Sequence, residues 1–333
     1  MSKPVALLWF VGDHYSNFFS EELRNRLDHI VDVVEPASHI TTDFVSYLDR
    51  VDCVLATWGL PKFQDDWFHE STRVKGVFYA AGTVKSWACP ALFDRNILVT
   101  ATAGPNAIPV AHYTVAMVIL GLKNVLRHTQ QLKKERNEAW NKFHYPLKGI
   151  GPQSRVGIIG ASKIGRLVID ELLKLGVQVS VYDPYLTKDE ARRLGVNKQD
   201  LDELMESSDV VSLHAPDIPE TQKMINFSNL SLMRDGATFI NTARGALVDE
   251  EGLIEVLRED KISAVLDVTK PEPPEALSPL YTLPNCFLTP HLAGTGGYEC
   301  QRMCEQAIEE IERFFDGRDP IEPITREMLV RMA

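Results

Sequence analysis

Four side chains with acid–base or anion-binding chemistry stand just after apolar stretches in the second half of the chain. Arg244 lies in "FINTARGALVDEEGL", and Asp267 and Glu272 lie in "AVLDVTKPEPP". His291 lies in "CFLTPHLAG". A guanidinium can hold a carboxylate through two parallel N–H donors, and an imidazole exchanges protons near neutral pH. If the apolar stretches are parallel strands of one sheet, these side chains meet at the sheet edge where ligands bind.

Each of these residues also has a structural explanation when it is taken alone. Arg244 could form an ion pair at a strand end, Glu272 could be a solvated charge between two prolines, and His291 could be a loop histidine satisfied by hydrogen bonds. Their shared position after successive strands is explained better by one site than by three coincidences. The sequence therefore predicts a single catalytic centre.

An earlier turn, "GASKIG" from Gly160 to Gly165, has the form of a dinucleotide-binding loop. It follows an apolar stretch and precedes an amphipathic one, so backbone N–H groups and the positive end of a helix converge there. We expect Gly160 to make the tight turn and Gly165 to let the helix pack against the strand. Ser162 replaces the central glycine of the usual pattern, and its hydroxyl can itself donate to a phosphate oxygen.

Asp183 ends the apolar stretch "VQVSVYD", eighteen residues beyond Gly165. A carboxylate at this position binds the ribose hydroxyls of NAD and repels the 2′-phosphate of NADP. No arginine follows within the next several residues, so NAD is favoured as the cofactor. An aspartate that merely ends a strand before Pro184 would explain this residue, but not its combination with the loop.

Two series of alternating apolar and amphipathic stretches surround these residues. The strands expected in the first series are residues 5–11, 31–36, 51–57, 74–81 and 97–103. Those expected in the second are residues 155–160, 178–183, 210–215, 237–243, 262–268 and 286–290. A long helical stretch, 106–140, joins the series, with Asn106 as its cap and Pro109 in its first turn. The alternation predicts an α/β protein of two doubly wound parallel-sheet domains, the second a Rossmann dinucleotide-binding domain.

Composition excludes several other classes of protein. The chain has 333 residues and a net charge of −11, which argues against a nucleic-acid or membrane surface. No apolar run approaches the roughly 20 residues that span a bilayer, and the N-terminus is typical of a buried strand rather than a signal peptide. The five cysteines are odd in number and lack C-x-x-C spacing, which predicts reduced thiols, a cytoplasmic location and no metal site.

The chain resembles the D-isomer-specific 2-hydroxyacid dehydrogenases in four segments, "VSLHAPDIPET", "INTARGALVDEEGL", "LDVTKPEPP" and "LTPHLAG". The resemblance is strongest from Val156 to Gly294. It implies an NAD(H)-dependent oxidoreductase that interconverts a small 2-oxo acid and its D-2-hydroxy acid, with glyoxylate and hydroxypyruvate as candidates. It also implies a discontinuous substrate domain, residues 1–105 plus 296–333, and an NAD-binding domain, residues 106–295, with a cleft between them.

The resemblance implies a role for each candidate residue. Arg244 would bind the substrate carboxylate, His291 would be the general acid in reduction and the base in oxidation, and Glu272 would orient His291. Asp267 would lie near the nicotinamide carboxamide. The implied cofactor contacts are Gly160, Ser162, Lys163, Ile164, Gly165, Asp183, Ala215, Pro216, Thr221, Thr242, Ala243, Asp267 and Gly294.

The expected substrate loop departs from the family pattern. The family usually has Gly-x-Asp-Asn here, and "YAAGTVKSWACP" keeps Ala81, Gly82 and Thr83 but has Val84 and Lys85 in place of Asp-Asn. Two interpretations stay open: Lys85 is simply exposed to solvent, or it faces the cleft and favours a substrate with a second anionic group. The implied substrate contacts are Ala81, Gly82, Thr83, Lys85 and Arg244.

Two other functions share the implied fold. Formate oxidation fits less well, because Glu272 stands where formate enzymes of this fold have glutamine. An NAD(H)-sensing binding protein, like the corepressors of this fold, would bind the cofactor with little turnover. The resemblance further implies a homodimer through the nucleotide domain, in which Trp140 either reaches the partner's active site or is an ordinary buried tryptophan.

Overall fold

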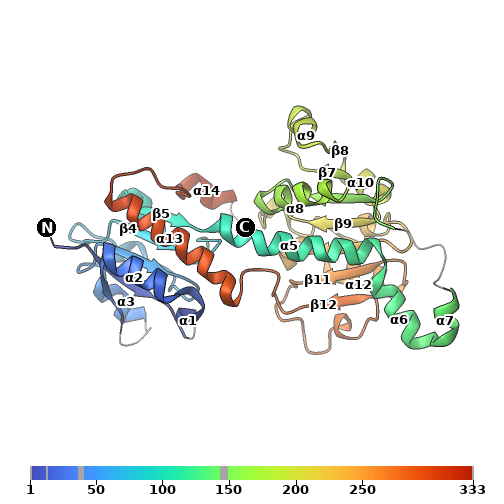
Figure 1. Ribbon diagram of the computed structural model, residues 1–333, viewed down its shortest axis with the longest axis horizontal. Coiled ribbons are helices and arrows are strands. Elements are labelled where there is room, and N and C mark those ends of the chain that lie inside the picture. The colour runs from blue at the N-terminus through green and yellow to red at the C-terminus, as the bar shows by residue number, and fades with distance from the viewer. Residues whose placement is uncertain (1, 13, 37–40, 143–148, 332–333) are drawn as a thin grey trace. The chain divides into compact units, whose positions relative to one another are not determined.

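The computed structural model describes residues 2–12, 14–36, 41–142 and 149–331. The chain forms two compact units, Met1–Ala107 with Thr295–Ala333, and Ile108–Gly294 (Figure 1). Each unit contains one parallel β-sheet. The predicted α/β class with two parallel sheets is confirmed.

The first unit is built on a five-stranded sheet with the order β2-β1-β3-β4-β5. Every strand lies inside a predicted apolar stretch, and β3 and β4 are buried throughout, as expected for a parallel sheet covered on both faces. The strands are β1 Val5–Trp9, β2 Asp32–Val34, β3 Cys53–Ala56, β4 Gly76–Tyr79 and β5 Leu98–Ala101.

Alternate side chains of these strands enter two separate cores, because successive residues of a strand point to opposite faces. Leu7 and Trp9 of β1 pack with α3 (Thr41–Tyr47) and α4 (Pro90–Asp94). Ala6 and Leu8 pack with the helices of the other face: α1 His14–Phe18, α2 Glu21–Ile30 and α13 Cys300–Phe315. Helix α13, from near the C-terminus, thus returns to the first sheet, and Figure 1 shows it beside α2.

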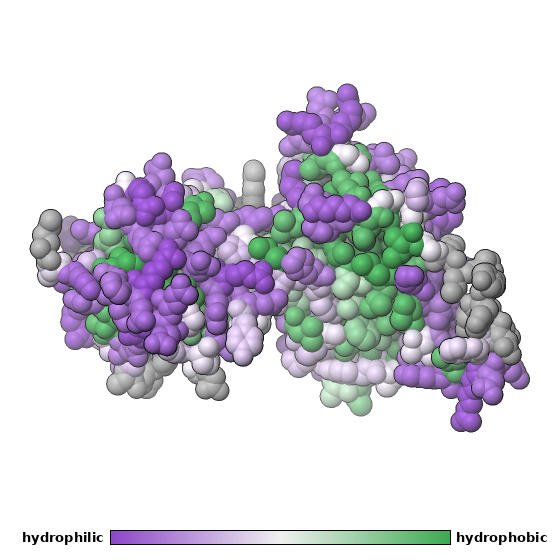
Figure 2. All heavy atoms as spheres, viewed as in Figure 1, coloured by the Kyte–Doolittle hydropathy of each residue, from purple (hydrophilic) through white to green (hydrophobic). Residues whose placement is uncertain are grey.

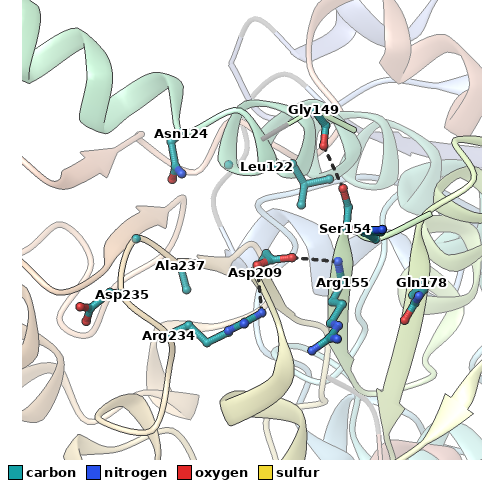
Figure 3. A pocket seen from close by; sticks show the side chains of 13 residues that line it. Leu122, Asn124, Gly149, Ser154, Arg155, Gln178, Asp209, Arg234, Asp235 and Ala237 are labelled. Atoms are coloured by element: carbon teal, nitrogen blue, oxygen red, sulfur yellow. Dashed lines mark hydrogen bonds and ion pairs between the residues drawn. The ribbon is translucent and has the colours of Figure 1, made fainter. Parts of the chain in front are cut away.

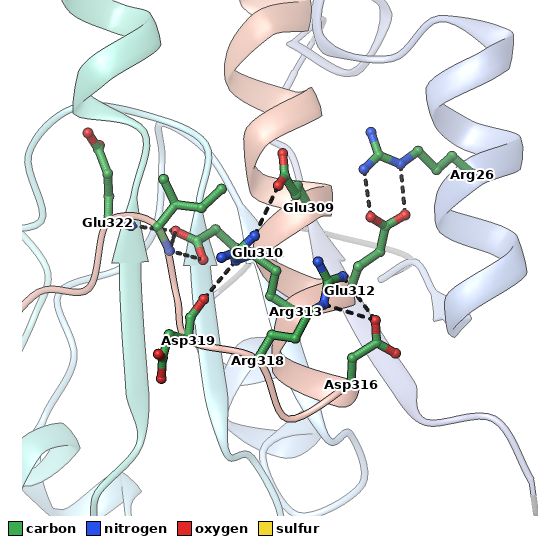
Figure 4. A network of polar contacts seen from close by, with 10 residues as sticks. Arg26, Glu309, Glu310, Glu312, Arg313, Asp316, Arg318, Asp319 and Glu322 are labelled. Carbon is green, nitrogen blue, oxygen red and sulfur yellow. Dashed lines mark hydrogen bonds and ion pairs between the residues drawn. The ribbon is translucent and has the colours of Figure 1, made fainter.

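A buried carboxylate on α13 fixes the last segment of the chain (Figure 4). Glu310 is fully buried, and its two oxygens accept the N–H of Ile321 at 3.1 and 2.9 Å and that of Glu322 at 2.7 Å. Glu322 in turn accepts the N–H of Gly104 at 3.1 Å, in the first turn of α5. Backbone donors replace the water that a buried carboxylate would otherwise need. The segment is thereby held beside β5, where Ile324 N donates to Val99 O.

The second unit is built on a seven-stranded sheet with the order β12-β11-β10-β9-β6-β7-β8. Six of its strands lie in predicted stretches. The two-residue edge strand β8 was not predicted, because both of its residues are polar and exposed and carry no strand pattern. The strands are β6 Arg155–Ile159, β7 Gln178–Tyr182, β8 Asn197–Lys198, β9 Val210–Leu213, β10 Thr238–Asn241, β11 Ser263–Leu266 and β12 Cys286–Leu288.

Helices cover both faces of this sheet as well. One core joins the strands to α5 and to α8, and the other joins them to α10 and α12. Five α-helices follow β6 in this unit. They are α8 Lys163–Lys174, α9 Lys188–Leu194, α10 Leu201–Ser207, α11 Phe227–Leu230 and α12 Glu250–Arg258. The 3₁₀ turns are η1 Asp65–Trp67, η2 Pro219–Thr221, η3 Gly245–Leu247, η4 Pro279–Tyr281 and η5 Gly297–Glu299, and a last helix, α14, is Arg326–Arg331.

The predicted helical stretch between the two series is divided into three helices, α5 Ala103–Leu122, α6 Val125–Glu135 and α7 Asn137–Lys142. Asn124 and Arg136 separate them, each with a φ of 50° that breaks the helical path. The predicted cap at Asn106 is wrong, because α5 already begins at Ala103 and Asn106 N donates to Thr102 O within it. Pro109 accordingly lies in the second turn of the helix rather than the first.

Helix α5 is long and apolar enough to cross a membrane by length and composition. Ala111, Val118 and Leu122 pack in the core of the second unit, so α5 is a core helix. Met117, Ile119 and Leu120 remain partly exposed on it. Figure 2 shows apolar side chains gathered on the surface of the second unit, where Figure 1 places α5.

Candidate active site

The residues predicted to act together follow the carboxyl ends of six strands of the seven-stranded sheet. These strands are parallel neighbours in register, so their carboxyl ends lie side by side. The residues at this edge are Gly160 after β6, Asp183 after β7, Ala215 after β9, Thr242 to Arg244 after β10, Asp267 after β11 and His291 after β12.

The turn after β6 leaves no room for side chains at its two outer glycines. Gly160 has a φ of +98°, and a Cβ built on it would lie 2.8 Å from Ala215 N. A Cβ on Gly165 would lie 2.1 Å from Gly160 O. The loop is therefore pressed against the residues that follow β9, and only glycine permits this approach. A Cβ built on Gly294, by contrast, would meet no atom within 4 Å.

Ser162, the residue that replaces the central glycine, is the N-cap of α8. Its Oγ accepts the N–H of Gly165 at 3.3 Å. The hydroxyl proton remains available as a donor toward an anion, and the twelve-residue helix directs its positive end to the same point. Lys163 and Ile164 open the helix, with Lys163 exposed and Ile164 partly packed in the core.

Asp183 joins the loop to the end of β7. One carboxylate oxygen accepts the N–H of Ala161 at 2.8 Å and the other accepts that of Tyr185 at 2.8 Å. The negative charge is thus held directly beside the turn after β6. This arrangement, with the glycine cradle and the helix end, fits a dinucleotide whose pyrophosphate lies on the turn and whose ribose meets the carboxylate.

His214 forms the floor beneath the turn after β6. Its Nε2 is 2.9 Å from Ser212 Oγ, while its Nδ1 has no hydrogen-bond partner among the described residues. Complete burial lowers the pKa of His214 to about 3, so the ring is neutral at physiological pH. This histidine packs under the loop as a neutral ring.

The hydroxyls of two predicted cofactor contacts are used inside the protein. Thr221 Oγ1 donates to Pro216 O at 2.5 Å and accepts the N–H of Ile218 at 3.1 Å, which closes the turn after β9. Thr242 Oγ1 is 3.0 Å from Thr114 Oγ1 of α5. Any contact that these residues make with a cofactor is left to their backbone and remaining side-chain atoms.

Arg244 is held by the turn that follows β10. Its Nη1 donates to Ala243 O at 2.6 Å, and its own carbonyl accepts Asn241 Nδ2 at 3.0 Å. Burial lowers the pKa of Arg244, and the charges of Asp217 and Glu272 oppose that shift. Since an arginine pKa starts above 12, the side chain stays a cation. Asp217 was not predicted as a partner of this site, because no local sequence pattern connects it to Arg244.

His291 and Glu272 form a close pair. His291 Nδ1 lies 2.5 Å from Glu272 Oε1, and the two side chains are 48% and 44% exposed. The bond to Nδ1 leaves Nε2 as the nitrogen that can exchange a proton with a substrate. His291 has a φ of 51°, a left-handed conformation that is uncommon for a residue with a side chain.

Asp267 anchors the loop that carries His291. It is buried, and its Oδ1 accepts Thr289 Oγ1 at 2.6 Å and Leu292 N at 2.9 Å, while Oδ2 accepts Ala293 N at 2.9 Å. This role was not predicted, because the partners follow a different strand. The predicted contact with the nicotinamide carboxamide stays a prediction.

The predicted substrate loop lies in the first unit, after β4. Ala81 is buried and its carbonyl accepts Thr102 N at 3.0 Å, and a Cβ on Gly82 would lie 2.9 Å from Asn106 Nδ2. Thr83 Oγ1 accepts the N–H of Lys85 at 3.4 Å. The Lys85 side chain is exposed, which both interpretations of this residue require.

Two cavities lie at opposite ends of the strands of the seven-stranded sheet. A polar cavity of about 400 Å³ lies at the amino ends of the strands. There the Asp209 carboxylate accepts hydrogen bonds from Arg155 N and Arg234 Nη1 (Figure 3). It contains none of the residues predicted to act. A larger cavity of about 730 Å³ is lined by Asp267, Glu272 and His291 with residues of β12.

The structure shows no metal cluster and no disulfide in the part of the chain that it describes. No group of three or more histidine, cysteine or acidic side chains there could hold a metal ion. All five cysteines are unpaired, and those at 53, 89, 300 and 304 are buried in the first unit.

Residues 115–293 match the family described as "D-isomer specific 2-hydroxyacid dehydrogenase, NAD binding domain". The chain is 33% identical over 245 residues to a glyoxylate reductase of Thermofilum pendens, covering 72% of this chain and 71% of the relative. It is 31% identical over 288 residues to a D-3-phosphoglycerate dehydrogenase of Methanocaldococcus jannaschii, covering 85% of this chain. The chain spans 54% of that relative, about half its length.

Solved structures show the same fold. D-mandelate dehydrogenase of Rhodotorula graminis aligns over 98% of this chain and 99% of its own, with a TM-score of 0.81 and 20% identity. An acyclic imino acid reductase in complex with NADPH and D-Arg aligns over 96% and 100%, with a TM-score of 0.74 and 22% identity. The protein belongs to the D-isomer-specific 2-hydroxyacid dehydrogenases, a family of NAD(P)-binding oxidoreductases.

Proposed function

We propose that the protein is an NAD(H)-dependent oxidoreductase that interconverts a small 2-oxo acid and its D-2-hydroxy acid. The observation that carries the proposal is the 2.5 Å contact between His291 Nδ1 and Glu272, at the sheet edge that also presents Arg244. Relatives named glyoxylate reductase and hydroxypyruvate reductase make those two acids the first to test.

The chemistry follows from the residue types at this edge. The Arg244 guanidinium binds the substrate carboxylate through parallel N–H donors. His291 Nε2 gives a proton to the carbonyl oxygen in reduction and takes it from the hydroxyl in oxidation, while Glu272 on Nδ1 fixes the ring and stabilises the imidazolium. The bound dinucleotide supplies the hydride in reduction and accepts it in oxidation.

NAD(H) is the proposed cofactor rather than NADP(H). Asp183 holds a negative charge beside the turn after β6, where the 2′-phosphate of NADP would be repelled. Arg166, in the first turn of α8, donates to Ala161 O at 3.0 Å and lies 4.0 Å from Glu190. Titration of the purified protein with NADH and NADPH tests this preference directly.

Lys85 is proposed to select a substrate with a second anionic group. Its exposed ammonium follows the loop predicted to hold the substrate, and several relatives are named D-3-phosphoglycerate dehydrogenase. Lys85→Ala should lower kcat/KM for a phosphorylated or dicarboxylic 2-oxo acid about tenfold, and change that for a monoanionic acid by less than twofold. Equal losses on both substrates would reject this role.

We also propose that the protein is a homodimer and is located in the cytoplasm. Trp140 is 60% exposed, so the alternative of an ordinary buried tryptophan is wrong. Met117, Ile119 and Leu120 of α5 are partly exposed apolar residues on the second unit as well. Light scattering over a range of concentrations measures the oligomeric state.

The deciding experiment is NADH oxidation against a panel of 2-oxo acids, with His291→Ala in parallel. We expect saturable turnover that the variant loses by about 10³-fold or more, the range for removal of a general acid. NADH binding without turnover on any acid would instead favour an NAD(H)-sensing binding protein.

A further inference from the structure

The hydrogen bonds that hold the His291 loop continue beyond Asp267 to helix α5. Thr289 Oγ1 donates to Asp267 Oδ1 at 2.6 Å, and Tyr113 Oη lies 3.0 Å from the same Thr289 oxygen. A threonine hydroxyl has one proton, and here it is donated in the hydrogen bond to the Asp267 carboxylate. Tyr113 must therefore be the donor in its bond to Thr289. The three side chains form a directed chain from Tyr113 through Thr289 to Asp267.

The chain ends on the backbone around His291. The Asp267 carboxylate accepts the N–H groups of Leu292 and Ala293, and its backbone carbonyl accepts the N–H of His291 at 3.0 Å. These bonds surround the residue with the left-handed φ of 51°. A conformation of this kind persists only where the surrounding structure fixes it. The direction of the His291 ring therefore depends on Asp267 keeping its own orientation.

Tyr113 is suited to hold Asp267 in that orientation. Its burial raises the pKa of Tyr113 above the ordinary value, so the hydroxyl keeps its proton at physiological pH. The neighbouring residue on α5, Thr114, is 3.0 Å from Thr242 Oγ1 at the start of the segment that leads to Arg244. One turn of α5 thus contacts both loops that carry the proposed catalytic side chains.

We propose that Tyr113 is a positioning residue for the reaction, which acts through Thr289 and Asp267 to fix the loop that presents His291. The proposal rests on the proposed function, since it takes His291 as the acid–base group. Without the Tyr113 hydroxyl, Thr289 loses its donor and can rotate away from Asp267. The loop then samples orientations in which His291 Nε2 does not meet the carbonyl oxygen.

The first test is Tyr113→Phe, which removes the hydroxyl and keeps the ring. We expect kcat to fall about tenfold while the Kd for NADH changes by less than about twofold, because only the proton donor is misplaced. Amide hydrogen exchange in residues 289–293 should become faster. Tyr298→Phe, at a tyrosine that is 91% exposed, is the matched control and should change none of these.

A second pair of variants tests the middle of the chain. Thr289→Ser keeps the hydroxyl and should stay within about twofold of wild type, while Thr289→Val should lose as much as Tyr113→Phe. If Tyr113→Phe does not fold, as judged by its melting curve, this pair answers the same question. Equal activity of the Ser and Val variants would overturn the proposal.

The His291→Ala background separates this inference from the proposed function. Adding Tyr113→Phe should lower the residual turnover no further, because the hydroxyl acts through His291. A further tenfold fall would overturn the route through His291. A Tyr113→Phe protein with wild-type kcat, beside an inactive His291→Ala, would overturn the inference alone. Turnover at the wild-type rate in His291→Ala would refute His291 as the acid–base group, and absence of turnover in the wild-type protein would refute the proposed function itself.

Discussion

Asp267 in the second unit and Glu310 in the first are buried carboxylates that hold a segment through backbone N–H groups. Asp267 binds Leu292 and Ala293 in the loop of His291, and Glu310 binds Ile321 and Glu322 near the end of the chain. Both anions exchange water for fixed donors, which is the condition for burying a charge. The contacts are alike, and the segments that they hold are different.

The difference lies in what each held segment does. The loop around Asp267 carries the exposed His291–Glu272 pair, which we propose as the acid–base centre, whereas the segment held by Glu310 packs beside β5 and reaches the first turn of α5. The same interaction should therefore matter for turnover in one unit and for stability in the other. Four carboxylates, two buried and two partly exposed, test that distinction.

Asp267→Asn should have the largest effect. An amide cannot accept every donor around position 267, because its NH₂ group faces Leu292 N, Ala293 N or the Thr289 hydroxyl. We expect kcat to fall by about 10²–10³, with a loss of about 1–3 kcal/mol in the free energy of unfolding. Steady-state kinetics and urea denaturation of the same preparation measure both. A large loss of stability with kcat nearly unchanged would contradict the assigned role.

Glu310→Ala should show the reverse pattern. It leaves the N–H groups of Ile321 and Glu322 without an acceptor in a buried site, at a cost of about 2–4 kcal/mol in the free energy of unfolding. The folded fraction should keep kcat within about threefold of wild type, since the changed residue holds no catalytic loop. Glu309→Gln, at the half-buried neighbour that pairs with Arg313, is the control. Thermal melting with activity assays below the transition distinguishes the two patterns.

The sequence predicts one of these two carboxylates more fully than the other. Asp267 follows an apolar stretch at the edge where the motifs gather, so its place was predicted although its partners were not. Glu310 lies three residues after Ala307 and seven after Met303, on the buried stripe of α13. The helical period therefore marks it as a buried acid, but its partners lie beyond the helix and no local pattern names them.

The same limit explains the other differences. Eleven strands were predicted from their apolar residues, while β8 has two polar residues and was missed. Asn106 was expected to cap α5, yet Pro105 occupies the first turn and Ala103 begins the helix. The Tyr113–Thr289–Asp267 chain joins positions from three elements far apart in sequence. Composition and spacing predict elements, and contacts of this kind depend on the completed fold.

Asp183 is the third carboxylate, partly exposed and bound to the N–H groups of Ala161 and Tyr185. Asp183→Ala should weaken NADH binding about tenfold, or about 1.4 kcal/mol, and weaken NADPH binding less, because the repulsion of a 2′-phosphate is removed. Stability should change by less than about 1 kcal/mol, since water replaces the carboxylate. Fluorescence titrations with both dinucleotides measure the ratio. Equal weakening of the two would show that Asp183 only shapes the loop.

Glu312 is the fourth carboxylate, in a partly exposed ion pair, and its substitution should have the smallest effect on the free energy of unfolding. It pairs with Arg26 of α2 through two contacts of 2.8 and 2.6 Å, and its side chain is 25% exposed. The hydrogen bond from Arg26 lowers the pKa of Glu312, against the opposing effect of burial. Its stabilisation is therefore complete above the unfolded pKa of about 4.3 and is lost as the pH falls through the folded value. Glu312→Gln should cost about 0.5–1 kcal/mol at pH 7 and progressively less as the pH falls below about 4, with turnover unchanged. A cost that does not decrease as the pH is lowered would show that the side chain acts through packing rather than charge, and would place it with Glu310 as a contact that fixes the structure of the first unit.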